Sequence, residues 1–333
     1  MMERPDSRAH FPPTAREDRE PAFTIVAVPK AFNEHVGVVQ KHAVRSWLAQ
    51  RPAPEIVLCG DDPGTAETCA EYGLKHAPHI EYNDLGTPLM RSVLAQGEEH
   101  ASTNTILYTN ADIVFGGELA RAVDQLSSTT RPFVATGIRW NVPALEDIDY
   151  TDSEAVADLT SRVRRTGHLK RPWATDYFLF RKGFYAGMPP LTVGRKYTDN
   201  WMIWYALSVK AEVIDLTPRV TAIHEIHHHA HVIIGDPAIR YSGKGAPGGV
   251  EASRNLRLAG GRNHVCNVLD ATIVLTPDGM ERRISASRYA RKWLYARVLQ
   301  HYRRRLVLWL SHHQDRLMIY SHSSRRKLGL YRW

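Results

Sequence analysis

The sequence lacks most of the features that identify common classes of protein. Its three cysteines, Cys59, Cys69 and Cys266, have no metal-ligand spacing and cannot all pair with one another. They therefore indicate neither a zinc module nor a disulfide-stabilised secreted domain. No apolar run reaches the ~18 residues that a bilayer-spanning helix needs, and the first residues contain no signal-type apolar core. We therefore expect a protein of a reducing compartment, the cytoplasm.

Two common phosphate-binding motifs are also missing. No Gly-x-Gly-x-x-Gly follows the first predicted strand, which disfavours a dinucleotide-dependent oxidoreductase. The segment Ser242-Gly-Lys-Gly245 lacks the upstream glycine and the following Ser or Thr of a Walker loop. No helix-turn-helix, zinc-finger or RNA-recognition signature occurs, so we expect no nucleic-acid partner.

The net charge of +8 is concentrated at the C-terminal end of the chain. Residues 281–333 contain 14 Lys and Arg against two acidic residues, whereas the preceding 280 residues contain 29 basic and 33 acidic ones. Trp293, Leu306 and Trp309 lie among these arginines, as in a basic amphipathic helix. Such a helix can lie on an anionic membrane, or it can pack on the rest of the protein with a solvated basic face. We expect residues 279–333 to form a basic helical extension with peripheral membrane contact.

The remaining sequence alternates between strand and helix patterns. Residues 1–22, with four prolines and many charges, predict a disordered leader. Runs of apolar, mostly β-branched residues predict strands at 23–28, 55–60 and 105–109, and helical spacing predicts helices at 36–50, 65–72 and 89–100. This alternation predicts an α/β domain over residues 23–278, with a mostly parallel central sheet and helices on both faces.

Polar residues follow two of these strands at their carboxyl ends, where open α/β sheets bind ligands. Asp61 and Asp62 could accept hydrogen bonds from a nucleotide base or ribose, and the alternative is a simple Asp-Pro-Gly turn. The apolar run that starts at Thr105 ends on Asn110 and Asp112. Oxygen-bearing side chains one residue apart can hold a hard divalent cation, and the cation can hold a diphosphate, although Asn and Asp are also common turn formers.

Eight short motifs occur in order between about residue 23 and residue 276. They are Asp61-Asp-Pro-Gly-Thr65, Gly86-Thr-Pro-Leu89, Tyr108-Thr-Asn-Ala-Asp-Ile113, Arg139-Trp140, Thr175-Asp-Tyr-Phe178, Gly194-Arg195, Asp199-Asn-Trp201 and Ala222-Ile-His224. Together they resemble those of a group of GT-A-fold, family-2-like glycosyltransferases. The resemblance implies a GT-A-like fold. It also implies transfer of a sugar from a nucleoside-diphosphate donor, a UDP- or GDP-sugar, to a hydroxyl acceptor such as a saccharide.

The resemblance also implies a divalent cation, Mn²⁺ or Mg²⁺. In such enzymes an Asp-x-Asp element binds the cation and the donor diphosphate, and Asn110-Ala-Asp112 stands at its position with Asn replacing the first acid. Asp112 is then the carboxylate ligand that this element supplies. His224, at the end of a strand predicted over 217–223, would be the second protein ligand. Similar enzymes have Gln-Asn-His-Asp after this His, where this chain has Glu225-Ile-His-His.

The same resemblance assigns the remaining site residues. Asp199, at the start of a helix predicted over 201–209, would take the proton of the acceptor hydroxyl if configuration inverts, and its alternative role is a helix N-cap. Asp176, before a strand predicted over 177–180, would line the donor-sugar or acceptor pocket. Arg139 and Arg195 would contact phosphate or sugar, although an arginine beside a tryptophan is often a stacked structural pair.

Two other functions compete with this interpretation. His224-Glu225-Ile226-His227-His228 matches the zinc-protease pattern His-Glu-x-x-His, with Glu251 as a third ligand, but that pattern requires a helix. The residues before His224 instead predict a strand. The other alternative is a nucleotide-sugar- or carbohydrate-binding protein that keeps the fold without turnover, which the replacement of the first acid by Asn110 favours.

Overall fold

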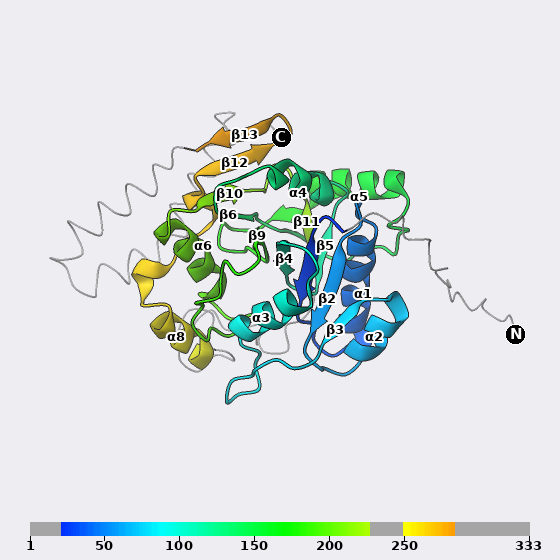
Figure 1. Cartoon of the computed structure of the whole chain (residues 1–333). Helices are drawn as coiled ribbons and strands as arrows, with labels where there is room; N and C mark the ends of the chain where they lie inside the picture. Colours follow the sequence, from blue (N-terminus) through cyan, green and yellow to red (C-terminus); the bar gives the residue numbers. More distant parts are fainter. Residues whose placement is uncertain (1–20, 227–248, 284–333) are drawn as a thin grey trace, which may run out of the picture.

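The computed structural model describes residues 21–226 and 249–283, and it contains two β-sheets with helices packed around them (Figure 1). The larger sheet has nine strands in the order β13-β12-β10-β6-β9-β4-β1-β2-β3. Its strands are β1 (Thr24–Ala27), β2 (Glu55–Cys59), β3 (Lys75–Ala77), β4 (Thr105–Thr109), β6 (Phe133–Thr136), β9 (Tyr177–Arg181), β10 (Glu212–Asp215), β12 (Ile273–Thr276) and β13 (Gly279–Arg282). Five of the eight neighbouring pairs are parallel. The predicted mostly parallel α/β sheet is therefore confirmed.

The helices cover both faces of this sheet, as the sequence predicts. They are α1 (Glu34–Leu48), α2 (Thr65–Tyr72), α3 (Met90–His100), α4 (Leu119–Ser127), α5 (Ser153–Thr166), α6 (Thr198–Ser208) and α8 (Gly249–Leu258). Because successive strand residues point to opposite faces, β1 contributes Ile25 to one core and Val26 to the other. The first core contains buried residues of α1, α4 and α5, and the second contains those of α3 and α6.

Local chemistry explains where several of these helices lie. The side chain of Asp152 accepts hydrogen bonds from the backbone N–H groups of Glu154 and Ala155, which caps α5. In α3, a Cβ on Gly97 would lie 2.3 Å from Cγ1 of Val26, so only glycine lets this helix approach β1 so closely. This close contact fixes α3 against β1, whose carboxyl end lies at the edge of the candidate site.

A smaller sheet lies beside the carboxyl end of β4. Its strands, in the order β5-β11-β7-β8, are β5 (Ile113–Phe115), β7 (Trp140–Val142), β8 (His168–Leu169) and β11 (Ala222–Glu225). β11 pairs with β5 in the antiparallel sense and with β7 in the parallel sense. The strand predicted over 105–109 is β4, and β5, which follows Asn110 and Asp112, belongs to the smaller sheet.

Two predicted elements have different limits in the structure. The strand predicted over 217–223 is wrong in its first part, because the N–H of Thr217 donates to Oδ1 of Asp215 at 2.9 Å and closes a turn. β11 consequently starts only at Ala222. The helix predicted over 201–209 starts earlier, at Thr198, so that Asp199 lies within its first turn.

The predicted helical extension from residue 279 is wrong for its first residues. Gly279–Arg282 form β13, which pairs with β12 in the antiparallel sense after the turn at Pro277 and Asp278. The guanidinium of Arg283 donates to Oδ2 of Asp215 at 2.7 Å, so this hairpin belongs to the sheet. The rest of the predicted extension, 284–333, and residues 1–20 of the predicted leader lie outside the described residues. No helix among the described residues has the length and apolar character needed to cross a bilayer.

Candidate active site

Strand pairing brings Asp112 and His224 together. β5 starts directly after Asp112, and its first residue, Ile113, lies opposite His224 of β11. Nε2 of His224 is consequently 3.5 Å from Oδ2 of Asp112. The imidazole is almost fully buried, whereas 20% of the Asp112 side chain is exposed. The two residues expected to bind a cation are therefore in contact, with the carboxylate on the accessible side.

The surroundings of Asp112 favour its ionised form. Burial alone would raise the pKa of Asp112, but the hydrogen bond from His224 and the charges of His224, Lys30 and Arg139 lower this pKa below its usual value. An ionised carboxylate beside an imidazole is a donor set that suits Mn²⁺ and is compatible with Mg²⁺. Within residues 21–226 and 249–283, no group of three or more His, Cys, Asp or Glu forms a metal site. A cation held here would complete its coordination with oxygen atoms of a ligand and with water.

Asn110 is hydrogen-bonded to Asp176 and does not take the place of the first metal-binding acid of an Asp-x-Asp element. β4 and β9 pair so that Thr109 lies opposite Tyr177, which brings Asn110 beside Asp176. The amide of Asn110 donates to Oδ1 of Asp176 at 2.8 Å, and its backbone N–H donates to the carbonyl of Asp176 at 2.9 Å. An aspartate at position 110 would place two carboxylates against each other. The pairing thus explains how an asparagine fits at this position.

Arg139 also binds Asp176. Its guanidinium donates to Oδ1 of Asp176 at 2.5 Å and to Oδ1 of Asn141 at 3.1 Å. The second carboxylate oxygen of Asp176 is buried and accepts no hydrogen bond from the residues that the structure describes. Arg139 is therefore an ion-pair partner of Asp176, and the other oxygen of Asp176 is left buried without a hydrogen bond from these residues.

Asp199 lies in the first turn of α6 and does not cap it. The residue at the N-cap is Tyr197, with φ of 82°, and no side-chain capping bond is formed there. Burial, followed by the negative charge of Asp176, raises the pKa of Asp199 well above the usual value, and the charge of Arg139 offsets part of that increase. The charges of Asp176 and Arg139 therefore both act on Asp199. A carboxyl group with a raised pKa suits general-base chemistry.

Asp61 and Asp62 follow β2 at the same edge of the sheet, two strands from β4. Burial, followed by the charge of Asp61, raises the pKa of the half-buried Asp62. The hydroxyl of Tyr82 lies 3.3 Å from the position that a Cβ would take on Gly60, whose φ is +90°. A side chain at position 60 would be strained and would crowd the tyrosine, so glycine keeps the space beside the two acids open.

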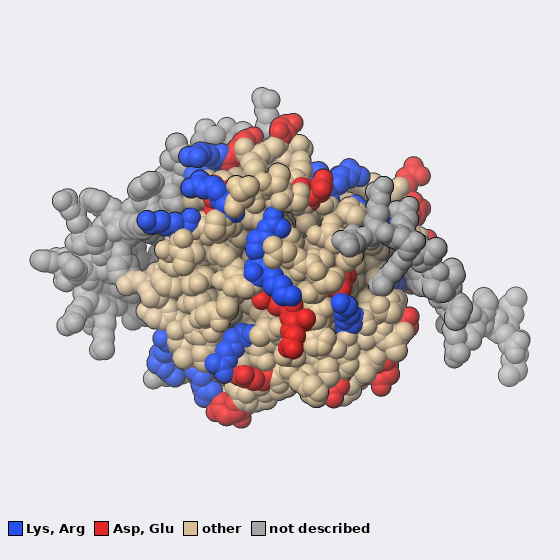
Figure 2. All heavy atoms as spheres, in the orientation of Figure 1, with Lys and Arg blue, Asp and Glu red and all other residues tan. Residues whose placement is uncertain are grey.

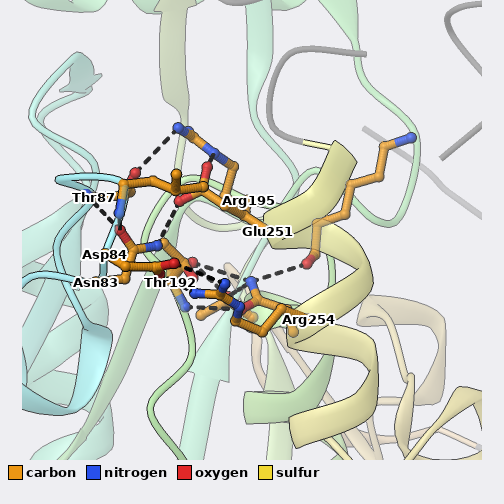
Figure 3. Close-up of polar contacts among 11 residues, drawn as sticks. Asn83, Asp84, Thr87, Thr192, Arg195, Glu251 and Arg254 are labelled. Atoms are coloured by element: carbon orange, nitrogen blue, oxygen red, sulfur yellow. Dashed lines mark hydrogen bonds and ion pairs between the residues drawn. The ribbon is translucent and has the colours of Figure 1, made fainter. Parts of the chain in front are cut away.

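Arg195 lies in a second polar cluster, which joins α8 to two loops (Figure 3). Its Nε donates to Oε2 of Glu251 at 2.5 Å, and the amide of Asn83 donates to the other oxygen of Glu251 at 2.6 Å. Arg254 of the same helix forms an ion pair with Asp84. Donor binding by Arg195 stays a prediction, because its principal contact here is the nearly buried Glu251.

Asn255 of α8 fixes the turn that leads to Asp199. It accepts a hydrogen bond from the N–H of Thr192 at 2.9 Å, and its amide donates to Oγ1 of Thr198 at 3.0 Å and to the carbonyls of Thr192 and Lys196 at 3.3 Å. The side chain is fully buried. One helix thus holds both ends of residues 192–198.

We expect Asn255→Ala to lower the free energy of unfolding by about 2–4 kcal/mol, because it leaves several buried backbone groups unsatisfied. Urea denaturation would measure the change. Asn104→Ala, at an exposed asparagine, is the matched control and should change stability by less than about 0.5 kcal/mol. Equal effects of the two substitutions would contradict the importance of this clamp.

The zinc-protease alternative is wrong, because His224 and Glu225 lie on strand β11 rather than on a helix. Glu225 accepts hydrogen bonds from the backbone N–H of Leu145 at 2.9 Å and lies 2.7 Å from Nε2 of His35. Glu251, the suggested third ligand, is bound to Arg195. His227 and His228 lie outside the described residues.

A hollow of about 260 Å³ lies at the opposite edge of the large sheet. It is lined by Arg131, Lys210, Glu212 and Arg282 among others, and these residues precede β6, precede or begin β10, or end β13. Figure 2 shows Lys and Arg side chains near this end of β12 and β13, and further groups of Lys and Arg in the middle and at the lower left of the same face. Because Asp112 follows the carboxyl end of β4, the hollow is separate from the candidate active site.

Sequence reasoning did not find Lys30. This residue follows β1, and its charge is one of those that lower the pKa of Asp112. The signal that could have identified it is a lysine just after the first strand, beside Pro29, at the edge where the other site residues occur. Its cationic side chain is exposed.

The geometry defines an α/β protein with a carboxylate–imidazole pair and further acidic and amide side chains at the carboxyl edge of its sheet. No protein family model matches the sequence, and no curated protein matches it. Solved structures similar to the chain include the mannosyltransferase PcManGT from Pyrobaculum calidifontis in complex with GDP-Man and Mn²⁺, with a TM-score of 0.41 and 15% identity. The match covers 64% of this chain and spans only 59% of the mannosyltransferase chain.

Two further structures are similar to the chain at the same level. Residues 1–349 of S. aureus TarS in complex with UDP-GlcNAc align with a TM-score of 0.43 and 13% identity, over 71% of this chain and 70% of that one. A putative nucleotide-diphospho-sugar transferase from Desulfovibrio desulfuricans G20 aligns with a TM-score of 0.37 and 11% identity, over 72% of this chain and 97% of that one. The function proposed below therefore rests on the side chains of this chain.

Proposed function

We propose that the chain is a glycosyltransferase that moves a sugar from a nucleoside-diphosphate donor, a UDP- or GDP-sugar, to a hydroxyl acceptor. The observation that carries this proposal is the Asp112–His224 pair at the carboxyl edge of the sheet, next to the Asn110–Asp176–Arg139 group. The pKa of Asp112 is lowered and the pKa of Asp199 is raised. The two carboxyl groups therefore suit two different roles within one site, Asp112 as an ionised metal ligand and Asp199 as a base.

In this proposal Asp112 and His224 hold Mn²⁺ or Mg²⁺. The cation would offset the charge that develops on the departing diphosphate. Asp61 and Asp62 would accept hydrogen bonds from the base or ribose, because they follow the strand two positions from β4 in the sheet. Asn110 would contact the ribose or the sugar, and Arg139 and Arg195 would contact phosphate or sugar.

Asp199 would take the proton of the acceptor hydroxyl in an inverting reaction, and Asp176 would support substrate binding. The ion pair with Arg139 holds one oxygen of Asp176 in place. Retention of configuration would make a base unnecessary. The configuration of the product therefore tests the role of Asp199 directly.

Calorimetry with UDP-, GDP- and TDP-sugars, each with and without Mn²⁺, tests the function. We expect one donor class to bind more tightly with Mn²⁺, and we expect slow donor hydrolysis or transfer to added saccharides. Failure of every donor to bind would overturn the proposal. Tight binding without turnover, for any acceptor tried, would instead favour the nucleotide-sugar-binding alternative.

The pH dependence of turnover should reflect the raised pKa of Asp199. The base must be ionised, so turnover should fall as the pH decreases through this pKa, at a pH above the usual range of about 4 for an aspartate. The free energy of unfolding should instead decrease as the pH rises. Because the pKa of Asp199 is higher in the folded protein, ionisation of Asp199 disfavours folding once the pH exceeds the pKa that Asp199 has in the unfolded chain. A profile of kcat against pH measures the first effect. Constant turnover down to pH 4 would contradict the assignment.

A further inference from the structure

Lys30 and Asp112 leave the large sheet side by side. β1 and β4 are adjacent parallel strands, and Val26 lies opposite Tyr108. Lys30 follows Val26 by the same number of residues as Asp112 follows Tyr108. Neighbouring strands are about 4.8 Å apart, so the two chains emerge at the same edge as neighbours. The effect of the Lys30 charge on Asp112 agrees with this placement.

The backbone of Lys30 is fixed by a single buried side chain. Gln40 of α1, which is 2% exposed, accepts a hydrogen bond from the N–H of Lys30 at 2.8 Å. Its amide donates to the carbonyl of Lys30 at 2.9 Å. Both backbone groups of one exposed residue are therefore satisfied by the same amide. This arrangement holds the Cα of Lys30 in place and leaves its ammonium group to solvent.

The loop that carries Lys30 also contacts the loop that carries Asp61 and Asp62. The N–H of Phe32 donates to the carbonyl of Pro63 at 2.8 Å. A Cβ on Gly64, whose φ is +87°, would lie 2.7 Å from Cβ of Phe32, so glycine permits this close contact. Lys30 thus stands on a fixed segment between the two acids after β2 and the Asp112–His224 pair.

The charges in this region leave Lys30 as an available cation. Arg139 is bound to Asp176, and His224 is in contact with Asp112. For Lys30, no carboxylate of residues 21–226 or 249–283 lies within ion-pair distance of its ammonium group. A fixed lysine without a carboxylate partner, near several acids, is suited to a ligand that itself carries negative charge.

We propose that Lys30 binds the diphosphate of the nucleotide donor, and that Gln40 positions Lys30 for this contact. The inference rests on the proposed glycosyltransferase function and adds a residue to it. A diphosphate between Asp112 and Lys30 would be neutralised from two sides, by the cation and by the ammonium group. Lys30 would then contribute to binding of the phosphates and not to binding of the base.

The test compares nucleotides with and without the diphosphate. In Lys30→Met we expect the affinity for UDP or GDP with Mn²⁺, whichever the wild type binds, to fall about tenfold or more, since hydrogen bonds to charged groups contribute about 1.5–3 kcal/mol. The affinity for the matching nucleoside, measured by NMR titration, should not change. Lys30→Arg should retain most of the diphosphate affinity. Lys210→Met, at an exposed lysine of the opposite sheet edge, is the matched control and should bind like the wild type.

A double-mutant cycle tests the positioning role of Gln40. In a Gln40→Met background, Lys30→Met should lower diphosphate affinity by a smaller factor than in the wild type, because Lys30 is no longer held in place. Equal factors in the two backgrounds would overturn the positioning role.

The outcomes separate this inference from the proposed function. Absence of nucleotide binding by the wild type overturns both. Nucleotide binding by the wild type with an unchanged affinity in Lys30→Met overturns only the assignment of Lys30. A loss of nucleoside affinity equal to the loss of diphosphate affinity would show that Lys30 shapes the whole site and would also overturn the assignment.

Discussion

Asp112→Ala should abolish the effect of Mn²⁺ on donor binding. Removal of outer partners of a metal ligand already costs roughly 10- to 100-fold in metal affinity, so loss of the ligand itself should cost ~10²-fold or more. The variant would also leave His224 without its carboxylate partner at 3.5 Å. Isothermal titration of the donor, with and without Mn²⁺, measures the change. We expect the two titrations to coincide in the variant and to differ in the wild type.

Two comparisons make this result specific. Asp124→Ala, at an exposed aspartate of α4, removes the same charge from a residue outside the candidate site and should leave the Mn²⁺ effect intact. His224→Ala should also weaken the Mn²⁺ effect, because the imidazole supplies the second protein ligand. If Asp112→Ala retained a full Mn²⁺ effect, the cation would have to bind elsewhere and the pair would lose its assigned role.

Asp199→Asn should lower kcat by ~10²-fold or more while leaving donor affinity nearly unchanged. The amide keeps the size of the side chain but cannot take a proton, so the loss appears in the chemical step and not in binding. Steady-state kinetics together with donor titration would separate the two effects. Full activity in Asp199→Asn would remove this residue from the mechanism and would agree with a retaining reaction.

The same variant should be more stable than the wild type at neutral pH. Burial and the neighbouring Asp176 raise the pKa of Asp199. Ionisation of Asp199 therefore opposes folding when the pH is above the pKa that Asp199 has in the unfolded chain. Asparagine removes that charge. Urea denaturation at several pH values should show a stability gain that grows as the pH rises and vanishes in acid. This gain would also show that lost turnover does not come from unfolding.

Local sequence patterns predicted much of the framework. The runs at 23–28, 55–60 and 105–109 coincide closely with β1, β2 and β4, and the helices at 65–72 and 89–100 coincide closely with α2 and α3. These elements alternate regularly and are bounded by turn residues, so the hydrophobic periodicity and the flanking turn residues were sufficient to locate them. The polar residues at strand ends were found for the same reason, because the carboxyl edge of a parallel sheet follows from strand direction alone.

Pairing between distant segments was not accessible in the same way. β9 lies antiparallel between β6 and β4, and only this insertion brings Asp176 to Asn110. The pattern of Tyr177–Phe180 predicted a strand, but an apolar run does not specify its partners. Likewise, the resemblance suggested that Asp112 and His224 share a cation, but the contact itself depends on the antiparallel register of β11 with β5.

Local composition alone determined the α/β class, the order of its main elements and the residues that end its strands, because these depend on neighbours in the chain. The tertiary structure alone decided which of those residues act together. It joined Arg195 to Glu251, clamped Lys30 with Gln40, and set the pKa of Asp199 through burial and the charge of Asp176. Hydrogen-bond partners, burial and electrostatic environment depend on segments far apart in sequence, so they become defined only when the sheets are assembled.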